Sequence, residues 1–292
     1  MGFRTVVIKS RAKLETRLNY LIIRAENECK IFIDEINTLI IQSTAVAVTA
    51  ALLCELIKHN VKVIFCDEKC NPQSELLPYY GAHNTPKRYL EQINWSEENK
   101  NVVWQSIIKQ KIKAQASFLS EKGFFEQSEM LCGYAENVLP NDITNREGHA
   151  AKVYFNCLLK DGYSRRSGGF VNGCLNYGYA VLTSAFNREI AASGYLTQLG
   201  IKHCNEFNEF NLACDFIEPF RPIVDKTALS LKEGDKDFKR KMANVLNYSA
   251  MIDDKNTTLD IAIKIYVKSL FNALNEGDVN LILFPQKIKH EL

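Results

Sequence analysis

The chain has 292 residues, of which 46% are hydrophobic and 24% are charged, enough apolar material to bury a large core in one large or two modest domains. Lysine and arginine exceed aspartate and glutamate by only two, 36 against 34. This balance excludes a protein whose overall field holds a polyanion, so any such binding must come from local basic clusters.

Membrane insertion and disulfide bonding are not expected either. The longest apolar run, residues 44–57, stops at Lys58 and is shorter than the roughly 20 residues that a membrane span needs. The nine cysteines are odd in number and irregularly spaced, and no signal peptide is recognised before them. We therefore expect free thiols in a reducing, cytoplasmic compartment, without a structural zinc site.

The first third of the chain is predicted to form a small β domain. Three segments are rich in β-branched and aromatic residues and are separated by charged or asparagine-containing breaks. They are residues 3–9, 18–24 and 30–42. A helix begun by Ser43 or Thr44 and ending near His59 is expected next, followed by a further buried strand at residues 61–66.

Turn-forming residues between positions 67 and 86 predict a connector, and we place the domain boundary there. Beyond it the apolar residues recur at helical spacing nearly to the end. The expected fold class is therefore α+β, with a small β-sheet or sandwich domain at residues 1–82 and a larger all-α domain at residues 83–292. Helices are expected at about residues 175–193 and 258–274, and the tail after Gly277 carries no clear pattern.

Glu147 is the first polar residue that needs an explanation. With Thr144 as N-cap, it would be the N3 partner of a capping box, an ordinary structural role. However, it also lies in helical register with Ala151, Tyr154 and Leu158, so its carboxylate would point along the apolar face of the helix. A carboxylate in that position needs a cation.

His203 is the second such residue. A lone histidine is usually a hydrogen-bonded structural residue. This one follows Lys202 in a loop-like segment that also holds asparagines at positions 205, 208 and 211. In that company, imidazole and carboxylate groups could share a divalent ion while a cation meets phosphate.

The third place is the acidic pair Asp215 and Glu218. Spaced three apart, both acids would share one helix face, with Asn211 as a candidate cap. Such a pair is usually solvated surface. The apolar residues around it, and the interruption of the backbone ladder by Pro219, make a metal seat the alternative.

Together these segments resemble the CRISPR-associated Cas-one (Cas1) family, closest to the version found beside type II effectors. The likeness covers about residues 3 to 225, and the order and spacing of the matching segments make it strong. Those segments are Arg-Thr-Val-Val at 4–7, Val-Ile-Phe-Cys-Asp at 63–67, Asn-Arg-Glu-Gly-His-Ala-Ala at 145–151, Leu-Asn-Tyr-Gly-Tyr at 175–179, Gln-Leu-Gly-Ile-Lys-His at 198–203, and Asp-Phe-Ile-Glu-Pro-Phe-Arg-Pro at 215–222.

The resemblance implies a site and a cofactor. The metal ligands of the family fall on Glu147, His203 and Glu218, which would also be the catalytic residues, and Asp215 would support them from behind. The implied cofactor is Mg²⁺ or Mn²⁺. The family's fold, a small β domain before a larger helical catalytic domain, agrees with the elements predicted above.

The implied function is that of a DNA integrase and endonuclease in CRISPR adaptation, the stage of antiviral defence that stores new spacers. The 3′-hydroxyl of a spacer fragment would attack a phosphodiester at the edge of the repeat by transesterification, and attack by water would give nuclease activity. Two alternatives stay open: a non-catalytic DNA-binding scaffold subunit, and a general nuclease for branched DNA.

The implied partners are double-stranded DNA, namely the spacer precursor and the CRISPR repeat, a second copy of the chain joined through the β domain, and a Cas-two (Cas2) companion subunit. The type II effector nuclease and a DNA-ring adaptation protein would join them. Five basic residues near the motifs are candidate phosphate contacts, each equally well explained as a surface charge or an internal ion pair. They are Arg146, Arg165, Arg166, Lys202 and Arg221.

Overall fold

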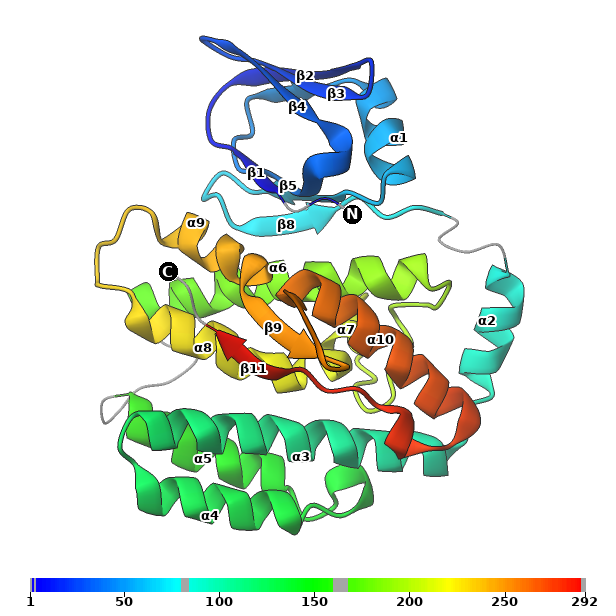
Figure 1. Ribbon diagram of the computed structural model, residues 1–292, viewed down its shortest axis with the longest axis vertical. Coiled ribbons are helices and arrows are strands. Elements are labelled where there is room, and N and C mark those ends of the chain that lie inside the picture. Colours follow the sequence, from blue (N-terminus) through cyan, green and yellow to red (C-terminus); the bar gives the residue numbers. More distant parts are fainter. Residues whose placement is uncertain (1, 3, 80–83, 160–167, 290–292) are drawn as a thin grey trace. The chain divides into compact units, whose positions relative to one another are not determined.

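The computed structural model describes residues 2, 4–79, 84–159 and 168–289 (Figure 1). The chain separates into two compact units, Met1–Ala82 and His83–Leu292. Among the described residues, no helix combines the length and the apolar character that crossing a bilayer requires.

The N-terminal unit contains two four-stranded sheets. In the first, three parallel strands are followed by an antiparallel one, in the order β1 (Arg4–Ile8), β5 (Ile36–Ile41), β7 (Lys62–Cys66), β8 (Pro72–Glu75). The second has the order β4 (Glu28–Phe32), β3 (Tyr20–Arg24), β2 (Ala12–Arg17), β6 (Val46–Val48). One apolar core joins residues of both sheets, including Leu14, Leu21, Leu39 and Val63, so this unit is the sheet-rich domain expected from the sequence.

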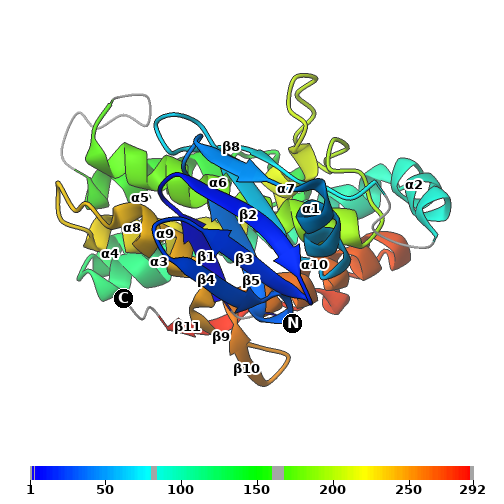
Figure 2. The same ribbon diagram turned by 90° about the horizontal axis from the view of Figure 1, so that it is seen from above.

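Two local expectations in this unit are wrong. Residues 30–42 do not form one strand, because a 3₁₀ turn at Ile33–Glu35 ends β4 and starts β5, which belongs to the other sheet. The helix α1 (Ala50–Lys58) begins later than expected, since β6 intervenes, and the hydroxyl of Thr49 accepts the N–H of Leu52 as its cap. Figure 2 shows α1 beside the strands of this unit.

The C-terminal unit is mostly helical, as expected. Its helices are α2 (Thr85–Ile93), α3 (Glu97–Glu121), α4 (Phe125–Glu136), α5 (Arg146–Leu158), α6 (Phe170–Ala192), α7 (Asn211–Phe216), α8 (Arg221–Ser230), α9 (Phe238–Ala243) and α10 (Leu259–Glu276). The unit is not purely helical, because a small antiparallel sheet is present. Its order is β10 (Lys255–Thr258), β9 (Ser249–Ile252), β11 (Gln286–Lys289).

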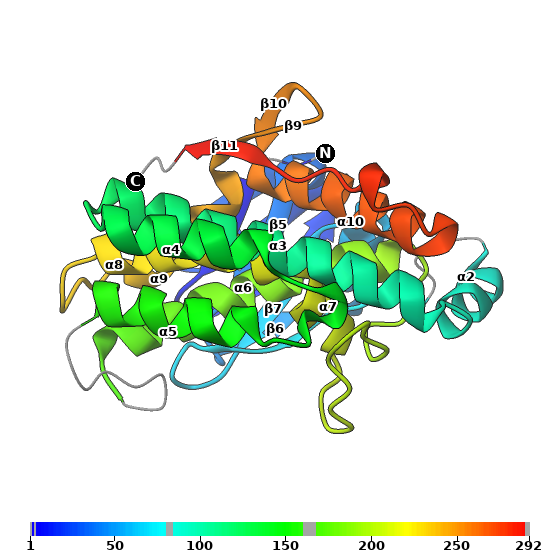
Figure 3. The same cartoon turned by 90° about the horizontal axis from the view of Figure 1, so that it is seen from below.

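The long helix α3 positions the candidate site. Its N-cap is Ser96, whose hydroxyl accepts the N–H of Asn99, and its buried face runs from Val103 to Leu119. The helices α4 and α5 lie along it (Figure 3). The helix α6 is fixed to α10 by a buried ion pair in which Arg188 donates to both carboxylate oxygens of Asp260, at 2.6 and 2.7 Å.

Candidate active site

Glu147 lies in the first turn of α5. The helix starts at Asn145, which has left-handed backbone angles (φ 51°, ψ 44°), and its side-chain oxygen accepts the N–H of Gly148 at 3.2 Å. The carboxylate of Asp142 accepts two further N–H groups, those of Arg146 at 2.8 Å and Glu147 at 3.0 Å. These two residues satisfy the free donors at the start of the helix.

The capping-box interpretation of Glu147 is therefore wrong. Thr144 precedes the cap residue, and the carboxylate of Glu147 makes its hydrogen bond to Lys111 rather than to the backbone. Because Asp142 and Asn145 do the capping, Glu147 is left to point toward α3. The structure thus favours the second interpretation of this residue, a carboxylate that faces a cation.

Glu218 reaches the same place from another element. The helix α7 ends at Phe216, and Glu218 opens a separate 3₁₀ turn, η3 (Glu218–Phe220), with Pro219 in its first turn. The single helix expected to carry both acids is thus broken. The side chain of Glu218 is only 4% exposed, which is far from a solvated surface acid.

Asn211 does not cap α7 as predicted, because Phe210 occupies the N-cap position. Instead its side-chain amide donates to the carbonyl oxygens of Gln198 at 3.0 Å and Asn205 at 2.9 Å. Asn211 therefore holds together the loop that carries His203.

Lys111 on α3 joins the two carboxylates. Its ammonium donates to Glu147 Oε1 at 2.5 Å and to Glu218 Oε2, while Arg221 Nε donates to Glu218 Oε1 at 2.7 Å. The sequence analysis missed Lys111. The available signal was its register: it lies four residues after the buried Ile107, so a lysine had to face the core.

Asp215 orients His203 from a fully buried position. Its Oδ1 accepts from the ring Nδ1 of His203 at 2.5 Å and from the backbone N–H of the same residue at 3.1 Å. Its Oδ2 accepts the N–H groups of Ile201 at 2.7 Å and Lys202 at 3.0 Å. Since the carboxylate is the acceptor, Nδ1 carries the hydrogen, and the neutral ring keeps its lone pair on Nε2.

The charges of these groups depend on one another. Burial opposes ionisation of Glu218, but Lys111 and Arg221 outweigh burial and lower its pKa to about 2. Burial likewise disfavours the charged form of Lys111, yet Glu218 and Glu147 outweigh it and raise the pKa of the lysine. Both partners are therefore charged at neutral pH.

His203 lies within electrostatic range of both acids. Its pKa is raised first by the hydrogen bond to Asp215, against burial, and then also by the charges of Glu218 and Glu147. Its ring is nearly perpendicular to that of Trp104, with 5.9 Å between the ring centroids. Three elements, α5, η3 and the loop before α7, thus bring Glu147, Glu218 and His203 into one neighbourhood.

The donor set suits a hard divalent cation. Two carboxylates and one imidazole, its other ring nitrogen fixed by a buried carboxylate, are ligands found for Mn²⁺ or Mg²⁺. In the side-chain arrangement shown, no group of three histidine, cysteine or acidic residues in the described part of the chain lies close enough to hold a metal. In this arrangement the ammonium of Lys111 lies between the two carboxylates and donates to both.

The candidate DNA contacts have different surroundings. Arg146 lies over the ring of Tyr134 at 5.5 Å. Lys202 is exposed and donates to the backbone and side-chain oxygens of Asn141, at 3.1 and 2.6 Å.

Arg221 is tied to Glu218 and lies 4.8 Å from the ring centroid of Tyr179, so it is an internal ion pair. Arg165 and Arg166 lie outside the described residues.

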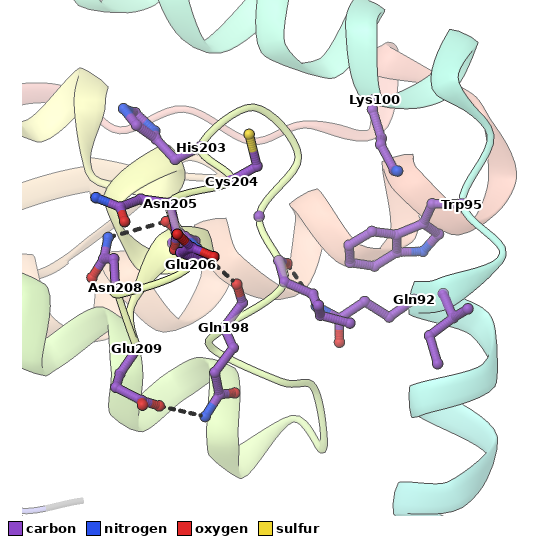
Figure 4. A pocket seen from close by; sticks show the side chains of 14 residues that line it. Gln92, Trp95, Lys100, Gln198, His203, Cys204, Asn205, Glu206, Asn208 and Glu209 are labelled. Carbon is purple, nitrogen blue, oxygen red and sulfur yellow. Dashed lines mark hydrogen bonds between the residues drawn. The ribbon is translucent and has the colours of Figure 1, made fainter.

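A pocket of about 610 Å³ opens next to His203. Figure 4 shows Trp95 and Lys100 on one side of it and the loop that bears His203, Asn205 and Asn208 on the other. The side-chain amides and Lys100 give this pocket hydrogen-bond donors and acceptors, and Trp95 gives it an aromatic surface.

Comparisons with known proteins agree with one another. A family model described as "CRISPR associated protein Cas1" matches residues 5–258. The "CRISPR-associated endonuclease Cas1" of Neisseria meningitidis serogroup C (strain 8013) is 33% identical over 294 aligned positions, covering 98% of this chain and 97% of the relative.

Solved structures share the fold. The "Casposase bound to integration product" is similar at a TM-score of 0.76 and 22% identity, covering 95% of this chain and 91% of that one. A chain of a "Cas6-RT-Cas1--Cas2 complex" is similar at a TM-score of 0.71 and 18% identity, covering 100% of this chain and 36% of that one.

Proposed function

The chain belongs to the CRISPR-associated Cas1 family, and on this premise we propose that it is an integrase that joins short DNA fragments to a CRISPR repeat by metal-dependent transesterification. The observation that supports this mechanism most directly is the convergence of Glu147 and Glu218, from separate elements, on one positive charge within electrostatic range of His203.

Glu147, Glu218 and the Nε2 atom of His203 would hold the divalent ion, Mg²⁺ or Mn²⁺. When bound, the ion would favour deprotonation of the attacking hydroxyl and polarise the phosphoryl group. Asp215 keeps the imidazole in the tautomer that presents Nε2, because its oxygen accepts the hydrogen on Nδ1. Arg221 fixes one oxygen of Glu218 and so sets the orientation of that carboxylate.

The reaction conserves phosphodiester bonds. The oxygen of a fragment's 3′-hydroxyl attacks the phosphorus at the edge of the repeat and loses its proton as the new P–O bond forms. The bond to the 3′ oxygen of the repeat strand breaks, and that oxygen takes up a proton. No nucleotide cofactor is needed, since one phosphodiester replaces another. With water as the attacking group, the same site hydrolyses DNA.

DNA would approach from the side of the pocket beside His203, where Lys202 is exposed and Arg146 lies nearby along α5. We further propose that the protein acts in the cytoplasm as a homodimer joined through its N-terminal unit. A Cas2 subunit would complete the complex, in keeping with the Cas1–Cas2 assembly named for one of the structures of similar fold. A type II effector nuclease and a DNA-ring protein would be additional partners.

The test is a reconstituted joining assay with a Cas2 subunit, fragment DNA, a repeat substrate and Mn²⁺ or Mg²⁺. We expect Glu147→Gln, His203→Ala and Glu218→Gln to abolish joined products while the proteins stay folded by circular dichroism. Glu129→Gln is the matched control: this acid is exposed on α4 and is not among the residues that line the pocket beside His203.

The outcomes separate the candidate functions. Full joining by any of the three variants would remove that residue from the site. Cleaved products without joined ones, in the unmodified protein, would indicate a general nuclease. DNA binding with neither product, and no change of melting temperature with metal, would indicate a scaffold subunit.

A further inference from the structure

The buried ammonium of Lys111 is the feature of the site that the reaction above does not use. It lies between a carboxylate that is 30% exposed, Glu147, and one that is 4% exposed, Glu218, and its own side chain is 9% exposed. Lysine is almost never buried to this degree unless it is paired. Here both of its partners are the carboxylates proposed to bind the metal.

A lysine and a divalent ion cannot share this position comfortably. The two carboxylates supply two negative charges, which the ammonium of Lys111 and the guanidinium of Arg221 already balance. Adding a divalent cation next to an unmoved ammonium would place like charges a few ångströms apart in a poorly solvated site, where their repulsion is strong. Either the ion binds weakly or the ammonium leaves.

We propose that Lys111 is the resident counter-ion of the metal seat: it holds Glu147 and Glu218 in position in the metal-free protein and withdraws when a divalent ion binds. This inference rests on the proposed function, because it takes the three ligands from it. Lys111 is thus a positioning residue that also sets the metal affinity.

The geometry provides the means for this exchange. A lysine side chain is a compact charge on a flexible four-carbon stem, so its ammonium can move without moving α3. The partly exposed side chain of Glu147 marks the side on which the ammonium can reach water. Glu218, which keeps its bond to Arg221, stays paired when the lysine leaves.

The roles of counter-ion and of simple structural support predict opposite results. A residue that only supports the fold would, when removed, loosen the carboxylates and weaken metal binding. A resident counter-ion competes with the metal, so its removal should strengthen metal binding while it destabilises the metal-free protein, in which two carboxylates then face each other without their cation.

The experiment is isothermal titration of the full-length protein with Mn²⁺, together with thermal unfolding in EDTA and in Mn²⁺. For Lys111→Met we expect Mn²⁺ to bind about tenfold more tightly or better, because one competing charge is gone. We also expect a lower melting temperature in EDTA and a larger rise on adding Mn²⁺. Lys113→Met is the matched control, since it removes the same charge from the exposed face of the same helix and should change neither quantity.

Lys111→Gln serves as the second variant if the methionine does not fold in either buffer. A Lys111→Met protein that folds only in Mn²⁺ would support the proposal, because the ion then replaces the lysine. Unchanged or weaker Mn²⁺ binding by a folded Lys111 variant would overturn the proposal. The metal site itself would still stand if the unmodified protein bound Mn²⁺ and Glu147→Gln did not. Mn²⁺ binding by neither protein would reject the metal site and the proposal together.

Discussion

Replacing Asp215 by asparagine tests how the histidine is held. Each carboxylate oxygen accepts two hydrogen bonds: Oδ1 from the backbone and the ring of His203, Oδ2 from the N–H groups of Ile201 and Lys202. Either orientation of the asparagine amide would therefore turn an NH₂ group toward two donors. Hydrogen bonds to a charged group are worth about 1.5–3 kcal/mol each, and because neighbouring losses do not add fully, we expect Asp215→Asn to cost about 3 kcal/mol of unfolding free energy.

The same substitution should weaken metal binding. Because no carboxylate then accepts the Nδ1 hydrogen of His203, the ring loses its fixed orientation and part of its basicity. Losing such a partner of a metal-binding histidine typically lowers metal affinity by about 10- to 100-fold, and we expect a loss in that range. Urea unfolding in EDTA measures the first effect and Mn²⁺ titration the second. Glu129→Gln, at the exposed acid on α4, should change neither. An Asp215→Asn protein with the stability and Mn²⁺ affinity of the unmodified one would refute the role given to this carboxylate.

Three further predictions follow from single contacts. In Gly200→Ala, the new Cβ would lie 2.3 Å from the carbonyl oxygen of His203, so we expect the unfolding free energy measured in urea to fall by about 1–3 kcal/mol. An unchanged unfolding free energy would contradict this close packing of the loop. Burial raises the pKa of Asp225 from 3.8 to about 6, so between these pH values the folded protein keeps a proton that the unfolded chain releases, and stability falls as the pH rises. Asp225→Asn should remove this pH dependence, so its unfolding free energy should rise by about 3 kcal/mol relative to that of the unmodified protein between pH 4 and pH 7. A difference in unfolding free energy that does not change with pH would contradict the raised pKa of Asp225. Arg188→Met breaks the buried pair with Asp260 and should cost about 3–5 kcal/mol while leaving the Mn²⁺ affinity of the folded protein unchanged.

The amino-acid pattern was sufficient for the fold class because each unit repeats one kind of periodicity. The strands of the N-terminal unit are rich in β-branched residues, and the helices beyond it bury regular apolar faces, as in α3. The break between β4 and β5 could not be found in the same way. The 3₁₀ turn at Ile33–Glu35 includes a fully buried isoleucine, so the apolar pattern continues while the chain changes sheets.

The small sheet of the C-terminal unit was missed for a different reason. Its strands have only four residues each, and the paired strands β9 and β11 are separated along the chain by the whole of α10. Strands this short carry little alternation, and their pairing depends on contacts that are distant along the chain.

Within the site, the spacing of residues along one helix predicted which way a side chain points, but it did not predict which residues of different helices meet. The position of Glu147 on the apolar face of α5 could be derived from spacing, and the structure places its carboxylate on Lys111. The spacing of the two acids misplaced Glu218, because this residue and Pro219 form a separate 3₁₀ turn instead of continuing α7. It gave no sign that Lys111 would lie between two acids separated from it by 36 and 107 residues along the chain.

Crystals of the protein grown or soaked with Mn²⁺ and measured at the manganese absorption edge would test the central claim most directly. We expect one anomalous peak about 2.0–2.3 Å from carboxylate oxygens of Glu147 and Glu218 and from Nε2 of His203, with the ammonium of Lys111 moved away from it. A peak bound elsewhere, or none while Lys111 still joins the two carboxylates at saturating Mn²⁺, would contradict the account.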